Sequence, residues 1–151
     1  MLKFILVKAL VFDGLLTALG DEYEIKVILD DHERAKFVAK NGKRVDSVLT
    51  NGTKGMTAEE MSTMPNVKLV SCFGAGYEGV DIDAAKQRGI ALSHGPGVND
   101  VCVADHAMAL LFAIVRRIVQ SDTKVHNGGW KSAEDTWPRL SEKTLGILGL
   151  G

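Results

Sequence analysis

The chain has 151 residues, of which 46% are hydrophobic and 25% are charged, and its formal net charge is −1. This composition is typical of an ordinary soluble globular protein, long enough for one domain or for one small domain and part of another. A charge this close to zero gives no electrostatic footprint for nucleic acid or an anionic membrane, so neither is expected as a partner.

The hydrophobic stretches are too short for a membrane span. The longest, residues 107–115, falls well below the roughly 20 residues that a bilayer-spanning helix needs. The N-terminus lacks the cleavage site of a signal peptide, and Lys8 and Asp13 interrupt its apolar run, so it is predicted to be a strand. Cys72 and Cys102 sit among apolar neighbours and are expected to be buried free thiols of a cytoplasmic protein.

Short apolar runs alternate with helical patterns through the first 93 residues, which is typical of β-α units with a parallel sheet. Strands are expected over residues 3–7, 23–29, 45–50, 67–72 and 90–93. Helices are expected over residues 10–19, 33–40, 57–64 and 81–88. The predicted fold is therefore an α/β, flavodoxin-like, doubly wound parallel sheet, with ligand sites at the carboxyl ends of its strands.

Two of these helices carry further local patterns. Thr57 and Glu60 have the spacing of a capping box, in which each side chain bonds the other residue's backbone N–H. Arg34, Lys36 and Lys40 form a run of positive charge, which is expected to be a solvated helix face rather than a docking patch.

A long helix is expected after the break at Gly95-Pro96-Gly97, capped by Asn99 or Asp100 and running to about Asn127. Its middle is apolar on every side, and such a helix must be covered on every side. It should lie between packed layers or in a subunit interface, and it predicts a homodimer through residues 100–127.

The end of the chain, residues 144–151, is expected to be a buried strand that runs into a Gly-x-Gly turn. We therefore divide the chain into a domain over residues 1–98 and a segment over residues 99–151. A hydrophobic terminal strand with a flexible end is the alternative for residues 144–151, although it would leave Ile147 and Leu148 without a sheet to cover them.

Residues 74–79, Gly-Ala-Gly-Tyr-Glu-Gly, fit the dinucleotide pattern G-x-G-x-x-G, but that fingerprint needs an acidic residue about 20 positions later. Ser93, His94 and Gly95 stand there instead. What remains is a turn before a helix, whose unpaired N–H groups can bind an anion such as a carboxylate. Gly149-Leu150-Gly151, after an apolar run, is how the true fingerprint begins.

Several motifs occur in a characteristic order: GAGYEGVD at 74–81, RGI at 88–90, HGPG at 94–97, VADH at 103–106, GW at 129–130 and LGILGLG at 145–151. Together they resemble the D-isomer-specific 2-hydroxyacid dehydrogenases, especially the bacterial glyoxylate and hydroxypyruvate reductase group. The resemblance is strong from about residue 67 onward and rests on element order before that. It implies a substrate-binding domain followed by the first helix and strand of a truncated Rossmann domain.

The resemblance also implies site residues. The substrate carboxylate would be held by the backbone N–H groups of Ala75 and Gly76, with the Asn51-Gly52 loop beside them. Val103 would pack near the nicotinamide ring, and the loop of Gly149 and Gly151 would carry the pyrophosphate of NAD or NADP. Three features of the family lie downstream of this chain: the catalytic arginine, the acid/base pair and the residue that selects NAD or NADP. No catalytic residue and no metal ligand is therefore assigned, and the chain alone is expected to be inactive.

The implied activity is reduction of a small 2-keto acid such as glyoxylate or hydroxypyruvate, or oxidation of the D-2-hydroxy acid. A non-catalytic NAD-sensing or dimeric binding scaffold of the same fold is the alternative, and a natural 151-residue product without catalysis is a third. Among single residues, His94 is expected to be structural, and Tyr77 either lines the substrate cleft or simply packs. Trp130 and Trp137 are expected at a domain or subunit surface.

Overall fold

A computed structural model describes residues 3–133 and 135–149 of the chain. Its internal contacts divide the protein into two units, Met1–Asn99 and Asp100–Gly151. The division falls one residue beyond the boundary expected from the sequence.

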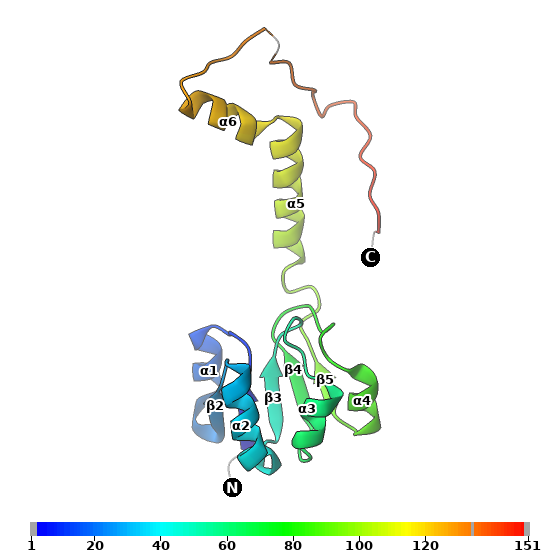
Figure 1. Ribbon diagram of the computed structural model, residues 1–151. Coiled ribbons are helices and arrows are strands. Elements are labelled where there is room, and N and C mark those ends of the chain that lie inside the picture. The colour runs from blue at the N-terminus through cyan, green and yellow to red at the C-terminus, as the bar shows by residue number, and fades with distance from the viewer. Residues whose placement is uncertain (1–2, 134, 150–151) are drawn as a thin grey trace. The chain divides into compact units, whose positions relative to one another are not determined.

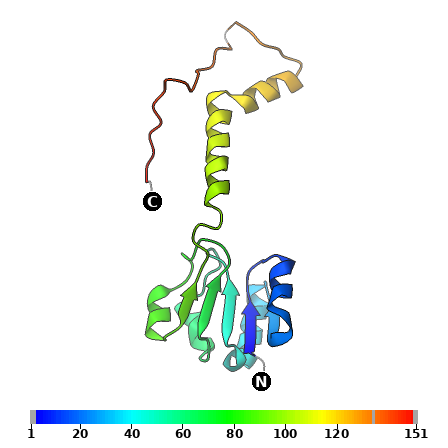
Figure 2. The same ribbon diagram turned by 180° about the vertical axis from the view of Figure 1, so that it is seen from behind.

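The first unit is built on a five-stranded, all-parallel sheet with the order β2-β1-β3-β4-β5 (Figures 1 and 2). Its strands are β1 Lys3–Val7, β2 Tyr23–Val27, β3 Ser47–Thr50, β4 Leu69–Cys72 and β5 Ala91–Ser93. This is the predicted flavodoxin-like order, in which the strand sequence reverses between β1 and β3. Loops at the carboxyl ends of the strands beside that reversal are therefore the first place to look for a ligand site.

Four α-helices and two short 3₁₀ turns connect the strands. They are α1 Asp13–Leu19, η1 Gly20–Glu22, α2 Asp31–Asn41, η2 Gly42–Arg44, α3 Ala58–Thr63 and α4 Ile82–Gln87. The first helix begins later than predicted, and Leu10 lies before it with 77% of its surface exposed. The capping box at Thr57 and Glu60 is confirmed, with hydrogen bonds of 3.2 Å and 3.0 Å in the two directions.

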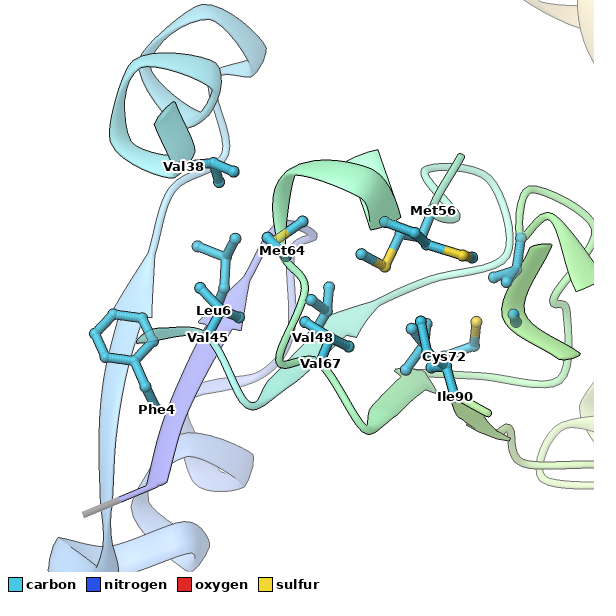
Figure 3. Close-up of a cluster of buried hydrophobic side chains, with 14 of the residues drawn as sticks. Phe4, Leu6, Val38, Val45, Val48, Met56, Met64, Val67, Cys72 and Ile90 are labelled. Atoms are coloured by element: carbon cyan, nitrogen blue, oxygen red, sulfur yellow. The ribbon is translucent and has the colours of Figure 1, made fainter. Parts of the chain in front are cut away.

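The core has two parts because side chains of a strand alternate between the two faces of its sheet. Phe4 and Leu6 of β1 belong to the larger cluster, which includes side chains of α2, α3 and α4. Ile5 and Val7 point the other way and pack with residues of α1. Figure 3 shows Leu6, Val45 and Val38 gathered in the larger cluster. The sheet thus carries helices on both faces, as a doubly wound fold requires.

Arg34 corrects one expectation about the surface. Lys36 and Lys40 are exposed as predicted, but Arg34 is buried, with only 7% of its surface accessible. Its guanidinium bonds the Asp31 carboxylate and donates to the backbone carbonyl of Ile28. A buried charge is tolerated when its donors are satisfied in this way. The run of positive charges in the sequence does not show which side chain has such partners, so it could not distinguish Arg34 from its solvated neighbours.

The second unit contains two helices, α5 Asp100–Val115 and α6 Ile118–His126. The predicted single helix to Asn127 is therefore wrong, because Arg117 adopts a left-handed conformation with φ 47° and ends the first helical run. The Arg117 guanidinium lies 4.8 Å from the centre of the Trp137 ring, a cation–π contact.

Helix α5 has no buried residue in the described part of the chain. Ile114 is 73% exposed, and Cys102 is exposed too, which contradicts the expectation that both cysteines are buried. None of the described helices is both long enough and apolar enough to cross a membrane. The apolar middle of α5 is therefore left uncovered by the described residues.

The predicted strand over residues 144–151 does not form within its described part, residues 144–149. Ile147 is 61% exposed and Leu148 is fully exposed. A strand needs a neighbour for its backbone N–H and C=O groups, and none of the described residues pairs with this segment. Gly149 has a positive φ of 82°, the conformation that a glycine turn uses. Gly151 lies outside the described residues.

Candidate functional site

Two loops meet at the carboxyl edge of the sheet, one after β3 and one after β4. The N–H of Gly79 donates to the carbonyl of Gly52 at 2.8 Å, and the N–H of Met56 donates to the carbonyl of Gly79 at 3.0 Å. The N–H of Asp81 returns a bond of 3.0 Å to the carbonyl of Met56. The structure thus brings together the two loops that carry the expected substrate-binding residues.

Glycine is required where these loops touch. A Cβ atom on Gly52 would lie 2.7 Å from the carbonyl carbon of Gly76, closer than real Cβ contacts allow. A Cβ on Gly55 would overlap the Gly79 carbonyl, and Gly55 also has a left-handed φ of 51°. The glycines therefore set how closely the two backbones approach.

The loop after β3 is closed by its own hydrogen bonds. The buried hydroxyl of Thr50 donates to the carbonyl of Gly55 at 2.9 Å. The side-chain oxygen of Asn51 accepts from the N–H of Lys54, and its backbone carbonyl accepts from the N–H of Gly55, both at 2.8 Å. Asn51 therefore shapes the loop, and its side-chain oxygen is engaged within it.

The loop after β4 presents the expected anion donors. Within the described residues, the N–H groups of Ala75 and Gly76 donate no hydrogen bond. The carbonyl of Ala75 lies 2.9 Å from Nδ1 of His94, and the His94 ring packs at 4.7 Å from the ring of Tyr77. His94 thus touches the candidate loop, and Tyr77 packs against it.

The helix that follows contributes less than expected. Helix α4 begins at Ile82, within one residue of the predicted start. The Asp81 carboxylate already accepts from the N–H of Ala84 at 2.9 Å at that helix end. The Asp81 side chain thus already occupies one of the free N–H groups at this end of α4.

Glu78 was not predicted as part of this site. A Cβ atom added to Gly52 would lie 2.9 Å from Oε2 of Glu78, and one added to Gly76 would lie 2.6 Å from the same atom. The Glu78 carboxylate therefore occupies the space between the two glycines. Burial raises the pKa of the Cys72 thiol, and the charge of Glu78 raises it further. An incoming anion therefore meets a like charge unless the exposed Glu78 side chain turns toward solvent.

A group of charged residues that the sequence analysis did not connect supports the loop after β3. Lys8 follows β1 and is 2% exposed, with Nζ 2.5 Å from Oε1 of Glu60. Arg34 bonds Asp31 at 2.5 Å, and Asp31 in turn accepts from Nζ of Lys54 at 3.2 Å. Burial lowers the pKa of Lys8, and the bond to Glu60 opposes that shift. The one sequence feature that could have indicated this charged group was the position of Lys8 inside an apolar run.

Two aromatic side chains lie at the same edge of the sheet. The ring centres of Phe12 and Phe73 are 5.6 Å apart, and the side chains are 60% and 40% exposed. The N–H of Phe73 bonds the carbonyl of Thr50 at 2.7 Å, which places Phe73 directly beside the two loops. An exposed aromatic pair next to a polar loop can cover an apolar part of a small ligand.

The expected cofactor residues all belong to the second unit. Val103 lies on α5 and is 58% exposed, and Gly149 has the turn conformation noted above. Gly151 falls outside the described part of the chain. Among the described residues, no cluster of three or more His, Cys, Asp or Glu side chains could hold a metal ion.

Comparison with known proteins gives consistent matches. Residues 6–145 match the family described as D-isomer specific 2-hydroxyacid dehydrogenase, catalytic domain. The chain is 36% identical over 137 residues to a glyoxylate reductase of Thermococcus litoralis, covering 85% of this chain and 41% of that protein. It is 33% identical over 132 residues to a D-3-phosphoglycerate dehydrogenase of Archaeoglobus fulgidus, covering 87% of this chain and 24% of that protein.

Solved structures agree with the sequence matches. An NADPH-dependent glyoxylate/hydroxypyruvate reductase from Sinorhizobium meliloti, in complex with NADP and malonate, aligns with a TM-score of 0.80 at 29% identity. That alignment covers 100% of this chain and 47% of the other. The chain therefore spans less than half the length of each of these relatives.

Proposed function

The chain belongs to the D-isomer specific 2-hydroxyacid dehydrogenase family, and we propose that it supplies the substrate-carboxylate site of an NAD(P)-dependent enzyme that reduces small 2-keto acids such as glyoxylate or hydroxypyruvate. One observation carries this proposal. The N–H groups of Ala75 and Gly76, which have no acceptor among the described residues, lie in a loop joined by hydrogen bonds to the loop of Asn51 and Gly52.

The chemistry of that loop fits a carboxylate. Hydrogen bonds from backbone N–H groups to an ionised oxygen are charge-assisted and roughly twice as strong as neutral ones. The close approach of Gly52 to Gly76 favours a small acid over a branched one. In this proposal the loop anchors the acid, and Phe12 and Phe73 limit water around its keto carbon.

We assign the cofactor to the second unit. Bound NADH or NADPH would supply the hydride, and the positive φ of Gly149 suits the glycine turn that approaches a pyrophosphate. Val103 is exposed on α5 and available to pack near a nicotinamide ring. Turnover also needs a cation on the carboxylate and a tuned proton donor, so we expect the 151-residue chain alone to be inactive.

We further propose that the protein is a homodimer through residues 100–127. Val101, Leu110 and Ile114 of α5 are 69%, 50% and 73% exposed. Exposed apolar surface gathered on one helix is typical of an interface. A second copy of the chain is the partner that such a surface fits most simply, because oligomers of soluble proteins are mostly symmetric homodimers.

The activity is tested by following the absorbance of NADH or NADPH with glyoxylate or hydroxypyruvate, using both this chain and the gene product that contains it. We expect turnover by the gene product and none by the chain. Gly76→Ala should raise KM for the keto acid, because a methyl group there would fill the space beside the Gly76 N–H that the Glu78 carboxylate now occupies. Gly89→Ala, which strains the backbone at a φ of 65° but has no atom within 4 Å, controls for a general loss of stability away from the site. Cofactor binding without turnover would instead support a binding scaffold.

A further inference from the structure

We propose that His94 is a positioning residue, whose imidazole fixes the peptide between Ala75 and Gly76 so that the Gly76 N–H faces the substrate carboxylate. This inference rests on the proposed function and deepens it. It starts from a contact between the end of β5 and the loop after β4, in which Nδ1 of His94 lies 2.9 Å from the carbonyl oxygen of Ala75.

The geometry of the peptide bond transmits the effect of that contact. The carbonyl of Ala75 and the N–H of Gly76 belong to one planar trans peptide, in which the two groups point in opposite directions. A hydrogen bond that holds the carbonyl toward His94 therefore aims the N–H away from it. That N–H has no acceptor among the described residues, so it remains available to a ligand.

His94 is itself held in place by its surroundings. Its ring packs at 4.7 Å against the ring of Tyr77. The N–H of the next residue, Gly95, donates to the carbonyl of Gly74 at 2.8 Å, which ties the end of β5 to the start of the same loop. The residue is half-buried, so its orientation is set by these contacts and not by solvent. A ring fixed on both sides can hold a peptide in one orientation.

The contact also assigns the proton on the ring. A carbonyl oxygen only accepts hydrogen bonds, so Nδ1 of His94 must carry a hydrogen. The neutral ring then has its lone pair on Nε2, and the protonated ring keeps the Nδ1–H as well. The positioning role therefore does not depend on the charge of His94. It requires only a donor at the place that Nδ1 occupies.

This requirement suggests a pair of substitutions. Nδ2 of asparagine is the same number of bonds from Cβ as Nδ1 of histidine, so His94→Asn can donate to Ala75 from a similar place. His94→Leu has a branch of similar reach but no donor. We expect His94→Leu to weaken binding of malonate to the full 151-residue chain by about 5- to 10-fold, the scale of one lost hydrogen bond. His94→Asn should recover most of that loss, and His32→Leu, at an exposed histidine of α2, should cause none.

Two nuclear magnetic resonance measurements on the isotope-labelled chain test the inference. The first is the nitrogen spectrum of the His94 ring and its scalar coupling to the carbonyl carbon of Ala75, which need no ligand. We expect a protonated Nδ1 and a measurable coupling. The second is a malonate titration followed at the Gly76 amide in the wild type and the three variants.

The possible results separate this inference from the proposed function. An unprotonated Nδ1 overturns the inference, as does malonate affinity that is unchanged in His94→Leu. If the wild type binds no malonate, the proposed carboxylate site fails, and the ligand-free spectra still decide the role of His94. In that case the inference is overturned if the ligand-free Gly76 amide has the same chemical shift in the wild type and in His94→Leu. It is upheld if that chemical shift changes in His94→Leu and returns to the wild-type value in His94→Asn.

Discussion

Nζ of Lys8 lies 2.5 Å from Oε1 of Glu60, although Lys8 is almost completely buried just after the interior strand β1. Both carboxylate oxygens of Glu60 are used, because Oε2 accepts from the N–H of Thr57 at 3.0 Å. This one side chain therefore joins β1 to the start of α3. Removing its charge would leave the lysine buried without its nearest partner.

We predict that Glu60→Gln destabilises the protein by about 3 kcal/mol, because breaking one side of a buried ion pair leaves an uncompensated charge. Lys8→Met should cost much less, since a flexible apolar side chain of similar length removes the charge and keeps the volume. The measurement is the free energy of unfolding in urea, with Glu59→Gln, at the exposed neighbour of Glu60, as control. A Lys8→Met variant that is less stable than Glu60→Gln would contradict this account.

Gly55 gives a prediction about the contact between the two loops. Gly55→Ala forces a left-handed φ of 51° on a residue with a side chain and drives its Cβ into the Gly79 carbonyl. Gly89→Ala imposes a similar φ of 65° where no atom lies within 4 Å. We expect the strained φ to lower the free energy of unfolding by about 1–2 kcal/mol in both variants. The overlap should lower it by about 1–3 kcal/mol more in Gly55→Ala alone. Equal losses in thermal or urea unfolding would mean that the loops separate at little cost.

The ion pairs of Asp31 predict how the stability of the protein changes at acidic pH. Hydrogen bonds from Arg34 and then Lys54 lower the pKa of its carboxyl group below the ordinary value. A group with a lowered folded-state pKa stabilises the fold above its unfolded pKa, about 3.9 for aspartate, and loses that contribution as pH falls through the folded value. Asp31→Asn should therefore have a lower melting temperature than wild type at pH 7, and the difference should shrink only below about pH 4. Lys54→Met should weaken the same dependence, and a difference that grows on acidification would contradict the assignment.

The proposed homodimer is tested at α5. Ile114 is 73% exposed and Leu111 lies one turn before it. Replacing both with Asp should give monomer or aggregate in light scattering, because a charge cannot be buried unpaired in an apolar interface. Gln87→Glu, at an exposed position of α4 outside residues 100–127, also adds a charge and should leave the dimer intact. A wild-type chain that is monomeric at all concentrations would remove the basis for this interface.

The fold of the first unit could be predicted because short sequence patterns specify its strands and helices. Apolar runs marked all five strands, the Thr57 and Glu60 spacing marked a capping box, and the regular alternation of strands and helices indicated a doubly wound parallel sheet. The strand at residues 144–149 could not be predicted correctly, because a strand forms only beside a neighbour and the described chain offers none. The break at Arg117 could not be predicted, because residues 100–127 contain no Gly or Pro that would mark a helix end.

The candidate site was predicted in outline only. The glycine motif pointed to Ala75 and Gly76, and the position of Asn51 and Gly52 after a neighbouring strand pointed to the same edge. The part played by Glu78, and the contact of His94 with Ala75, arise from side-chain directions that no spacing rule gives. Lys8 was visible as a charge in an apolar run, but its partner is 52 positions away.

We propose above that the loops after β3 and β4 hold a carboxylate. This proposal is tested most directly by titrating the labelled wild-type chain with malonate and with its neutral analogue malonamide, while recording every backbone amide signal. We expect malonate to move the signals of Gly52, Ala75 and Gly76 first and most, because the Ala75 and Gly76 N–H groups have no internal acceptor among the described residues. Malonamide should move these signals little. Equal effects of the two compounds, or malonate shifts confined to other parts of the chain, would contradict it.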